Sequence, residues 1–455
     1  MDRPLIARRE CLAWAALATA AATLRHRRAA ALGRIPLEGK IAMTLPWPVD
    51  RIDPHDVTCP GAALFAHTLF DELFAVEPGG DPFPTLAADL PVVETARTVI
   101  RLREGLTTAQ GEKLDARDVL FSIQRARKGP AAAWWGDLPA PALHPKDRLA
   151  LVFPTPDGGR LARTLSSPLF ALVPRSFDPS RPDGTGAMSG QLDSSRLALR
   201  RNPNAARGPS FLEEIAVEQA SDLSSSLRSF EGKLTDVGWL GSGLHGARPG
   251  AQSFDMGSVA WIVLQTGTEA GPWGGPGVAQ RLLDGLAPER FQRFGLGAMP
   301  APAAGSAEWG GRPCELWVNE GSVFMGELGR TLSSLLSRPG HEVTVRAAPT
   351  AEIARRRAAG TFSLMLGIVR PFAATPLGSH IALTAAVDAK SARELLLRPP
   401  RLTSFDPRVV TRTLTVGVLG ELRVMGAHAP DLHLARNQTA EGWDLGSTYR
   451  VSPGS

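Results

Sequence analysis

The chain has 455 residues, with 50 Lys and Arg against 45 Asp and Glu, which gives a formal net charge of +5. Of this charge, +4 lies within the first 31 residues, so the remainder is near +1 and the pI of about 9.5 is no argument for a nucleic-acid partner. A content of 43% hydrophobic and 21% charged residues is that of an ordinary globular protein and excludes a disordered chain. The length suffices for about three domain-sized units.

The first residues have the pattern of an export signal. Arg8 and Arg9 precede an apolar stretch over 11–24, which is too short to span a bilayer and suits the hydrophobic region of a signal peptide. The arginine pair favours the twin-arginine export route, with the general secretory route as the alternative. Small residues at 29–31 suit cleavage, so we expect a signal peptide over 1–31 and a periplasmic or otherwise extracytoplasmic protein.

Two cysteines, Cys59 and Cys314, lie outside the signal segment. In an oxidising compartment they could form a disulfide, and buried or inert thiols are the default. We expect inert thiols, and whether the two pair stays open.

Apolar periodicity predicts alternating strands and helices in the first part of the chain. A strand is predicted over 39–45, and apolar residues at helical spacing predict a helix over 61–74. Alternating residues over 100–103 and 149–153 predict half-buried strands. Between them, Asp115 is expected to cap the N-terminus of a helix with one apolar stripe.

The second part of the chain begins at a change of composition. An apolar run over 258–265 predicts a strand, and the Gly- and Pro-rich stretch over 267–277 marks a boundary between two lobes. A strand over 414–418 is expected to lead back towards the first lobe. The arginine run 355–357 is interpreted as a solvated helix face. Further strands are predicted over 315–318, 342–346 and 362–368, with a helix over 325–336.

Sequence motifs of enzymes fit poorly. The stretch 241–246 has the glycine spacing of a dinucleotide-binding loop, but Pro249 stands where its helix should begin, so no cofactor is expected. The chain has no Gly-x-Ser-x-Gly elbow, Ser-x-x-Lys pair or P-loop. His341 and Glu342 lack the second histidine of a zinc-protease helix, so no metal site is expected. We therefore expect a protein that is not an enzyme.

A series of short fragments carries the most specific information. They are Ile52-Asp53-Pro54-His55, Leu69-Phe70-Asp71-Glu72-Leu73, Pro84-Thr85-Leu86-Ala87, the stretches 100–105 and 114–122, Gly184-Thr185-Gly186 and Arg201-Asn202-Pro203. Each alone is a weak match. In this order, over residues 39–240, they resemble the family 5 extracytoplasmic solute-binding proteins of ABC transporters, the peptide- and nickel-binding type.

The resemblance implies a fold and a function. The fold would be α/β, periplasmic binding protein-like type II, with two lobes and an extra subdomain in the first lobe. Lobe I would span 32–258, lobe II 259–439, and residues 440–455 would return to lobe I. The protein would be a monomer that encloses a small-molecule or short-peptide ligand between its lobes and delivers it to an ABC permease. The alternatives are a secreted α/β hydrolase and a regulatory or scaffold relative that no longer transports.

In the family, aromatic side chains contact the ligand in the cleft between the lobes. Neighbouring side chains diverge, so at least one of Trp134 and Trp135 is expected to be exposed or to face a pocket, with ordinary packing as the alternative. The candidate ligand-binding aromatic residues are Trp47, Trp134, Trp135, Trp261 and Phe372.

One position departs from the peptide-binding relatives. After the stretch 360–367, those proteins continue with a turn that contains the Asp that binds the peptide amine, whereas this chain has Arg370 and no acid nearby. If Arg370 faces the cleft, an anionic or neutral ligand is favoured, and if it faces solvent, nothing follows about ligand charge.

Overall fold

The computed structural model describes residues 37–45, 49–77, 80–193, 196–221, 223–238, 248–296, 305–402 and 404–451. The predicted signal peptide, Trp47 and the glycine motif at 241–246 lie outside these residues. Within them, no helix is both long enough and apolar enough to span a membrane.

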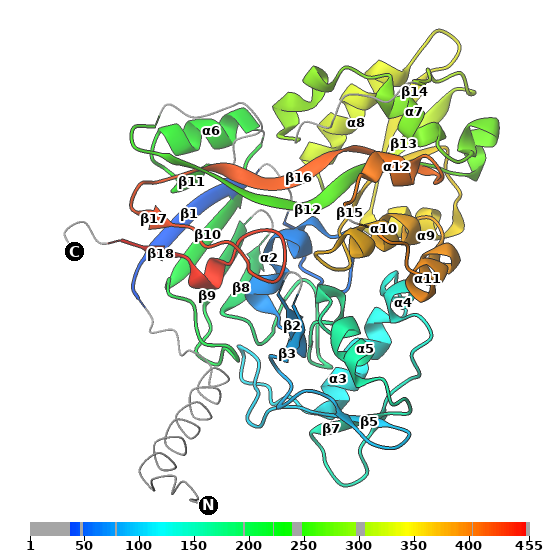
Figure 1. Cartoon of the computed structure of the whole chain (residues 1–455). Helices are drawn as coiled ribbons and strands as arrows, with labels where there is room; N and C mark the ends of the chain where they lie inside the picture. The colour runs from blue at the N-terminus through cyan, green and yellow to red at the C-terminus, as the bar shows by residue number, and fades with distance from the viewer. Residues whose placement is uncertain are drawn as a thin grey trace, which may run out of the picture.

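A ten-stranded sheet connects both lobes of the molecule (Figure 1). Its strands are β1 (Lys40–Leu45), β8 (Met188–Asp193), β9 (Arg196–Arg201), β10 (Glu214–Gln219), β11 (Val237–Gly238), β12 (Gln252–Thr266), β13 (Cys314–Asn319), β14 (Val343–Ala348), β15 (Leu364–Val369) and β16 (Val416–His428). The spatial order is β14-β13-β15-β12-β16-β11-β1-β10-β9-β8. We call the part around β1 and β8–β11 the first lobe, and the part around β13–β15 the second lobe. The predicted strands over 39–45, 258–265, 315–318, 342–346 and 362–368 are confirmed within these bounds.

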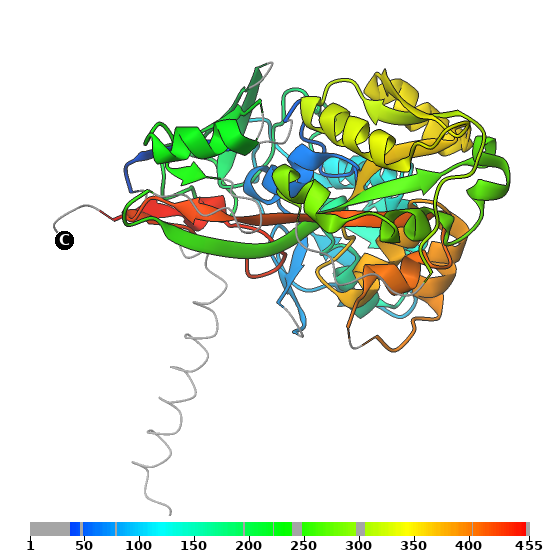
Figure 2. The same ribbon diagram turned by 90° about the horizontal axis from the view of Figure 1, so that it is seen from above.

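The long antiparallel strands β12 and β16 run from one lobe into the other, as Figures 1 and 2 show. Register shifts in their pairing, the first between Asp255 and Ser258, interrupt the ladder and allow it to curve. At its end, β16 pairs with β11 through His428 and Val237. The expected return to the first lobe is thus observed, and the chain reaches the first-lobe strands already at this point, ahead of residue 440.

The helix predicted over 61–74 is shorter than expected. It is α2 (Pro60–Leu69), and Phe74 already belongs to β2 (Phe74–Val76), which pairs with β3 (Pro82–Pro84). The backbone N–H of Gly186 donates to Leu69 O at 3.0 Å, so a distant segment takes up a carbonyl at the end of the helix. A Cβ on Gly186 would lie 2.4 Å from Thr68 O, so only glycine allows this close approach.

A separate four-stranded sheet lies beside the first lobe. It consists of β4 (Val92–Val93), β5 (Thr98–Arg101), β7 (Ala150–Phe153) and β6 (Ala142–Leu143), in this order. Helices α3 (Ala116–Ala126), α4 (Ala131–Trp135) and α5 (Gly158–Thr164) accompany it, with the short helix η1 (Pro168–Phe170). Asp115 caps α3 and forms a capping box with Asp118, so the predicted helix start is confirmed.

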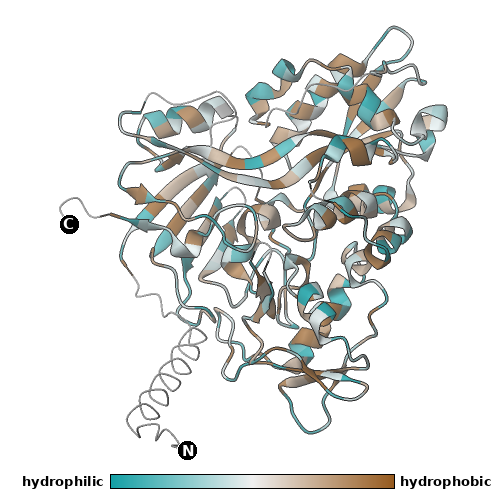
Figure 3. Cartoon of the chain, in the orientation of Figure 1, coloured by the Kyte–Doolittle hydropathy of each residue, from teal (hydrophilic) through white to brown (hydrophobic). Residues whose placement is uncertain are grey.

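The second lobe places helices around β13–β15. These are α7 (Val278–Asp284), α8 (Val323–Leu336), α9 (Thr350–Ala359), α10 (Pro376–Ala385), α11 (Ala389–Leu397) and α12 (Pro407–Thr411), while α6 (Leu223–Glu231) lies in the first lobe. The predicted helix over 325–336 is α8. In Figure 3 the helices carry both hydrophobic and hydrophilic segments, as amphipathic helices do.

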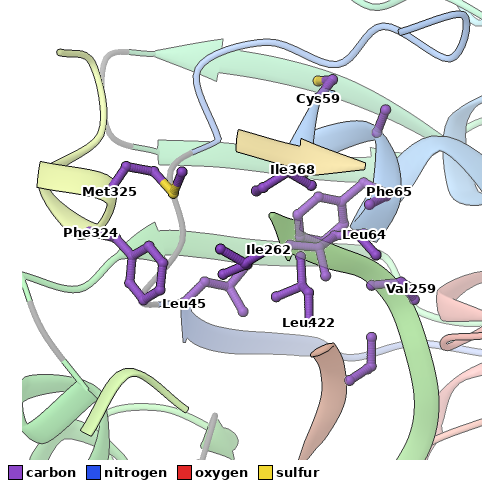
Figure 4. Close-up of a cluster of buried hydrophobic side chains, with 14 of the residues drawn as sticks. Leu45, Cys59, Leu64, Phe65, Val259, Ile262, Phe324, Met325, Ile368 and Leu422 are labelled. Atoms are coloured by element: carbon purple, nitrogen blue, oxygen red, sulfur yellow. The ribbon is translucent and has the colours of Figure 1, made fainter. Parts of the chain in front are cut away.

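One buried hydrophobic cluster crosses from lobe to lobe (Figure 4). It joins Leu45 of β1 and Phe65 of α2 to Ile262 of β12, Met325 of α8 and Ile368 of β15. Because the same cluster contains residues of both lobes, apolar packing joins them in addition to the two long strands.

Candidate functional site

A cavity of about 900 Å³ lies where segments of both lobes meet. The first lobe contributes the loop that precedes α2, with Arg51 and Asp56, and the segment after α3, with Lys128. The second lobe contributes β15, the start of α8, one side of α9 from its first to its last turn, and the connection from α10 to α11. Its apolar walls are aliphatic: Val57, Pro60, Pro130, Met325, Ala351, Ile353, Ala354, Ala358, Leu366, Ile368, Val369, Ala385, Ala386, Val387 and Ala389. A cavity of this volume is in the usual range for a small-ligand site.

The strand β15 presents part of one edge to this cavity. On one side it pairs with β12 over its whole length, from Leu364 to Val369. On the other side β13 pairs with it only at Leu364 and Met365. Residues 366–369 line the cavity, and the backbone N–H of the next residue, Arg370, donates to Val57 O at 2.9 Å. An edge without a neighbouring strand offers backbone groups to a ligand.

Arg357, on the last turn of α9, reaches into the cavity wall. Its guanidinium lies against β15, because a Cβ added to Gly367 would be 2.9 Å from Arg357 Nη2. The Nε atom is enclosed and has no hydrogen-bond partner, and no described residue forms an ion pair with the side chain. Burial lowers the pKa of Arg357, and the Asp56 carboxylate raises it in opposition.

Gln265 of β12 supplies a second unsatisfied group. Only 3% of it is exposed, its Nε2 donates to Ala386 O at 3.1 Å, and its Oε1 has no partner. Gln265 lies opposite Met365, two residues along β15 from Gly367, so its side chain is on the sheet face that Arg357 covers. Gln265 and Arg357 both line the cavity and also a neighbouring cavity of about 530 Å³.

The other charged groups of the cavity largely neutralise each other. Arg51 donates to Asp56 at 2.6 Å, and Asp56 also accepts bonds from the backbone N–H and hydroxyl of Thr58, at 2.8 and 2.7 Å. Asp50 and Lys128 are exposed at the rim. The lining therefore holds three cations and two carboxylates. Of the two guanidinium groups, that of Arg51 is paired with Asp56, and that of Arg357 has no paired acid among the described residues.

The Ile-Asp-Pro-His fragment fixes the loop that forms the first-lobe wall. Both carboxylate oxygens of Asp53 accept hydrogen bonds from Arg125 of α3, at 2.8 and 2.6 Å. Arg125 also donates to His55 Nδ1 at 3.0 Å, so this nitrogen is the acceptor, and His55 Nε2 donates to Ala171 O at 2.9 Å. Burial, with Arg125 as a further cause, lowers the pKa of His55 to about 4. The histidine is therefore neutral and structural.

The tryptophan pair is buried. Trp134 is 9% exposed and Trp135 is 1% exposed, so neither is exposed to solvent, and the alternative of ordinary packing fits both. The two side chains do diverge, but each enters a packed environment. Trp134 meets Phe372 edge to face at 6.3 Å, whereas Trp135 packs on Phe153 and Phe170. Neither lines the 900 Å³ cavity.

The other predicted site residues are also buried away from this cavity. Trp261 packs against Phe405, and Phe372 is completely buried. Arg370 is 4% exposed, and its Nη1 has no hydrogen-bond partner, so it faces neither solvent nor the cavity that Arg357 lines. Arg370 therefore gives no information about the charge of a ligand in this cavity.

The arginine run at 355–357 is where sequence reasoning missed a residue. Arg355 is exposed and pairs with Glu352, as a solvated face predicts. Arg356 lies over the Trp317 ring at 3.9 Å, and Arg357 enters the cavity. Successive residues of a helix point about 100° apart, so three equal side chains can meet three environments. The expectation of a wholly solvated face is wrong.

The two cysteines are free thiols. Cys59 is buried, and its Sγ donates to Arg51 O at 3.2 Å, while Cys314 is partly buried at the start of β13. Burial raises the pKa of both thiols to about 11. The two thiols are not joined in a disulfide, and the raised pKa values agree with the expectation of inert thiols.

No family model and no curated protein matches this sequence. Solved structures do match its shape. The dipeptide-binding protein of Pseudoalteromonas sp. SM9913 in complex with Met-Leu has a TM-score of 0.65 at 14% identity, over 90% of this chain and 100% of that chain. The chain has the type II periplasmic binding-protein fold.

Two further structures agree. The oligopeptide-binding protein AppA of Bacillus subtilis, in complex with a nonapeptide, has a TM-score of 0.63 at 10% identity, over 92% of this chain and 100% of that chain. The binding protein AgaA of A. tumefaciens R10, in complex with agropinic acid, has a TM-score of 0.65 at 14% identity, over 91% and 99%. The resemblance found in the sequence and the two-lobed α/β class are thus confirmed at the level of the fold.

Proposed function

We propose that the protein is the extracytoplasmic substrate-binding component of an ABC importer, which encloses a small organic solute between its lobes and delivers it to a membrane permease. The observation that carries this proposal is the 900 Å³ cavity between the lobes. In this fold, three solved neighbours hold a dipeptide, a nonapeptide and agropinic acid. The protein then acts by binding and closure as a monomer, and no bond is broken.

Three features of the chain support a role in binding. The cavity walls come from both lobes, so closure would surround a solute. Part of the β15 edge and two unsatisfied side-chain groups supply polar contacts, while the aliphatic walls supply apolar ones. The sequence also begins with the pattern of an export signal, which would bring the mature protein to the compartment where importers collect their solutes.

The test uses two exposed alanines of the same helix, α9. Ala354 lines the cavity, and Ala359 is not among its lining residues. We expect native mass spectrometry of the exported protein to detect a bound small molecule in the wild type and in Ala359→Phe, and to find it lost from Ala354→Phe. A ligand that both variants retain equally would show that the solute binds elsewhere. Covalent conversion of the bound molecule over time would favour the hydrolase alternative.

A further inference from the structure

Two polar groups in the cavity wall lack the partners that buried polar groups normally have. Arg357 Nε is a donor without an acceptor, and Gln265 Oε1 is an acceptor without a donor. Leaving such groups unpaired costs free energy, so native proteins rarely do so without a reason. Because the two residues lie on one face of the sheet and line the same cavity, one ligand can contact both side chains.

The charges of the cavity define what that ligand carries. Asp56 is already occupied by Arg51 and Thr58, and Asp50 is exposed at the rim, so no free carboxylate lies next to Arg357 to receive a cationic amine. Arg357, in contrast, has no described anionic partner in hydrogen-bonding contact. A guanidinium in a site poor in water binds a carboxylate through charge-assisted hydrogen bonds.

Given the proposed function, we propose that the solute is a small organic acid with one carboxylate and no cationic amine. Its carboxylate pairs with Arg357, and a neighbouring N–H or O–H of the ligand donates to Gln265 Oε1. The rest of the ligand is largely apolar and lies against the aliphatic walls. The class includes N-acylated amino acids and short peptides with a blocked amino end, and it excludes free peptides as preferred ligands.

Four probes of one skeleton separate the two charges. They are acetyl-Leu-Leu, free Leu-Leu, acetyl-Leu-Leu amide and Leu-Leu amide, which combine a free or blocked carboxylate with a free or blocked amine. We expect calorimetric titration of the mature protein to give the tightest binding for acetyl-Leu-Leu. Loss of its carboxylate should weaken binding about tenfold or more, as for a charge-assisted hydrogen bond. A free amine should weaken binding as well.

Three variants locate the effect. In Arg357→Gln the preference for the free carboxylate should disappear, and in Arg357→Lys, which keeps the charge, part of it should remain. Arg355→Gln is the matched control, because Arg355 is exposed on the same helix and does not line the cavity. A carboxylate preference that survives Arg357→Gln, or tightest binding of the compounds with a free amine, would overturn the proposal.

The outcome can be told apart from failure of the proposed function. If a natural ligand is displaced by Ala354→Phe but is cationic, or binds equally well to Arg357→Gln, the binding function stands and the organic-acid class is wrong. If none of the four probes binds and Ala354→Phe displaces no ligand, both are wrong. A third outcome is that none of the probes binds, but the natural ligand is an acid that binds Arg357→Gln more weakly than wild type. The organic-acid class of the ligand then stands, and the skeleton of the probes is too short or too long.

Discussion

Replacing Glu72 with Gln should make the protein more stable at alkaline pH and leave it unchanged in acid. Glu72 is 8% exposed, and burial together with the nearby Asp71 carboxylate raises its pKa to about 7 from its ordinary value of 4.5. The folded state thus holds this proton more tightly than the unfolded state. Its contribution to stability is fully present below the unfolded pKa and is lost as the pH rises from about 4.5 to about 7.

The magnitude follows from the size of the shift. Each pKa unit corresponds to about 1.4 kcal/mol, so the full loss for Glu72 is roughly 3 kcal/mol. His67, whose Nδ1 lies 3.8 Å from Glu72 Oε1, does not offset it at neutral pH, because burial, with Arg370 and Arg207 as further causes, lowers the pKa of His67 to about 4. Glu72→Gln removes the ionisable proton, so the variant does not lose this stability as the pH rises.

The assay is urea unfolding of wild type and Glu72→Gln between about pH 4.5 and pH 8, a range set by the two pKa values of Glu72. The difference in unfolding free energy should grow from near zero to roughly 3 kcal/mol in favour of the variant. Glu77→Gln, at an exposed position nearby, controls for the change in net charge. A difference that does not change with pH, or one that favours wild type at alkaline pH, would refute the assignment of a buried, weakly acidic Glu72.

Three further predictions concern stability and export. Asp53→Asn should lower the free energy of unfolding at neutral pH by about 3 kcal/mol, measured by urea unfolding, because it leaves Arg125 without its buried carboxylate. Gly186→Ala should cost about 2 kcal/mol or more in the same assay, since its Cβ would lie 2.4 Å from Thr68 O, while Gly159→Ala, which meets no atom within 4 Å, should not. N-terminal sequencing of exported protein should start near Leu32, and replacing Arg8 and Arg9 with Lys should block export if the twin-arginine route is used.

Elements with local signals could be predicted from the sequence. The start of α3 was predicted from Asp115, because a capping carboxylate acts on the first turn that follows it. The end of α2 could not be predicted, because a hydrogen bond from Gly186, more than a hundred residues away, takes up the carbonyl of Leu69. The apolar spacing of Leu73 and Phe74 is helical, yet Phe74 begins a strand. The hydrogen bond between distant segments, and not the local apolar spacing, therefore determines where this helix ends.

The candidate site was harder to predict for the same reason. The resemblance located the fold and the cleft between the lobes, but not the side chains that line this cavity. Gln265 and Arg357 are 92 positions apart in the sequence and meet only because β12 pairs with β15 beneath α9. Aromatic type suggested Trp134 and Phe372 as ligand contacts, whereas burial shows that they pack against each other. Residue type indicates what a side chain can do, and the fold decides which ones face a ligand.

The contact between Trp134 and Phe372 lies close in the chain to the residues that line the cavity. Phe372 follows β15 in the second lobe, and its ring meets Trp134 of α4, beside the four-stranded sheet, while its carbonyl accepts a hydrogen bond from Ser167. Two residues earlier, Arg370 N–H donates to Val57 O in the loop before α2. Residues 370–372 therefore contact parts of the chain outside the second lobe, and the four residues just before them line the cavity. Under the proposed function, a solute bound against that edge would hold the same stretch of chain in the position that makes these contacts. A solute that prefers the form with these contacts would then favour it, because a ligand shifts an equilibrium only through its preference for one state.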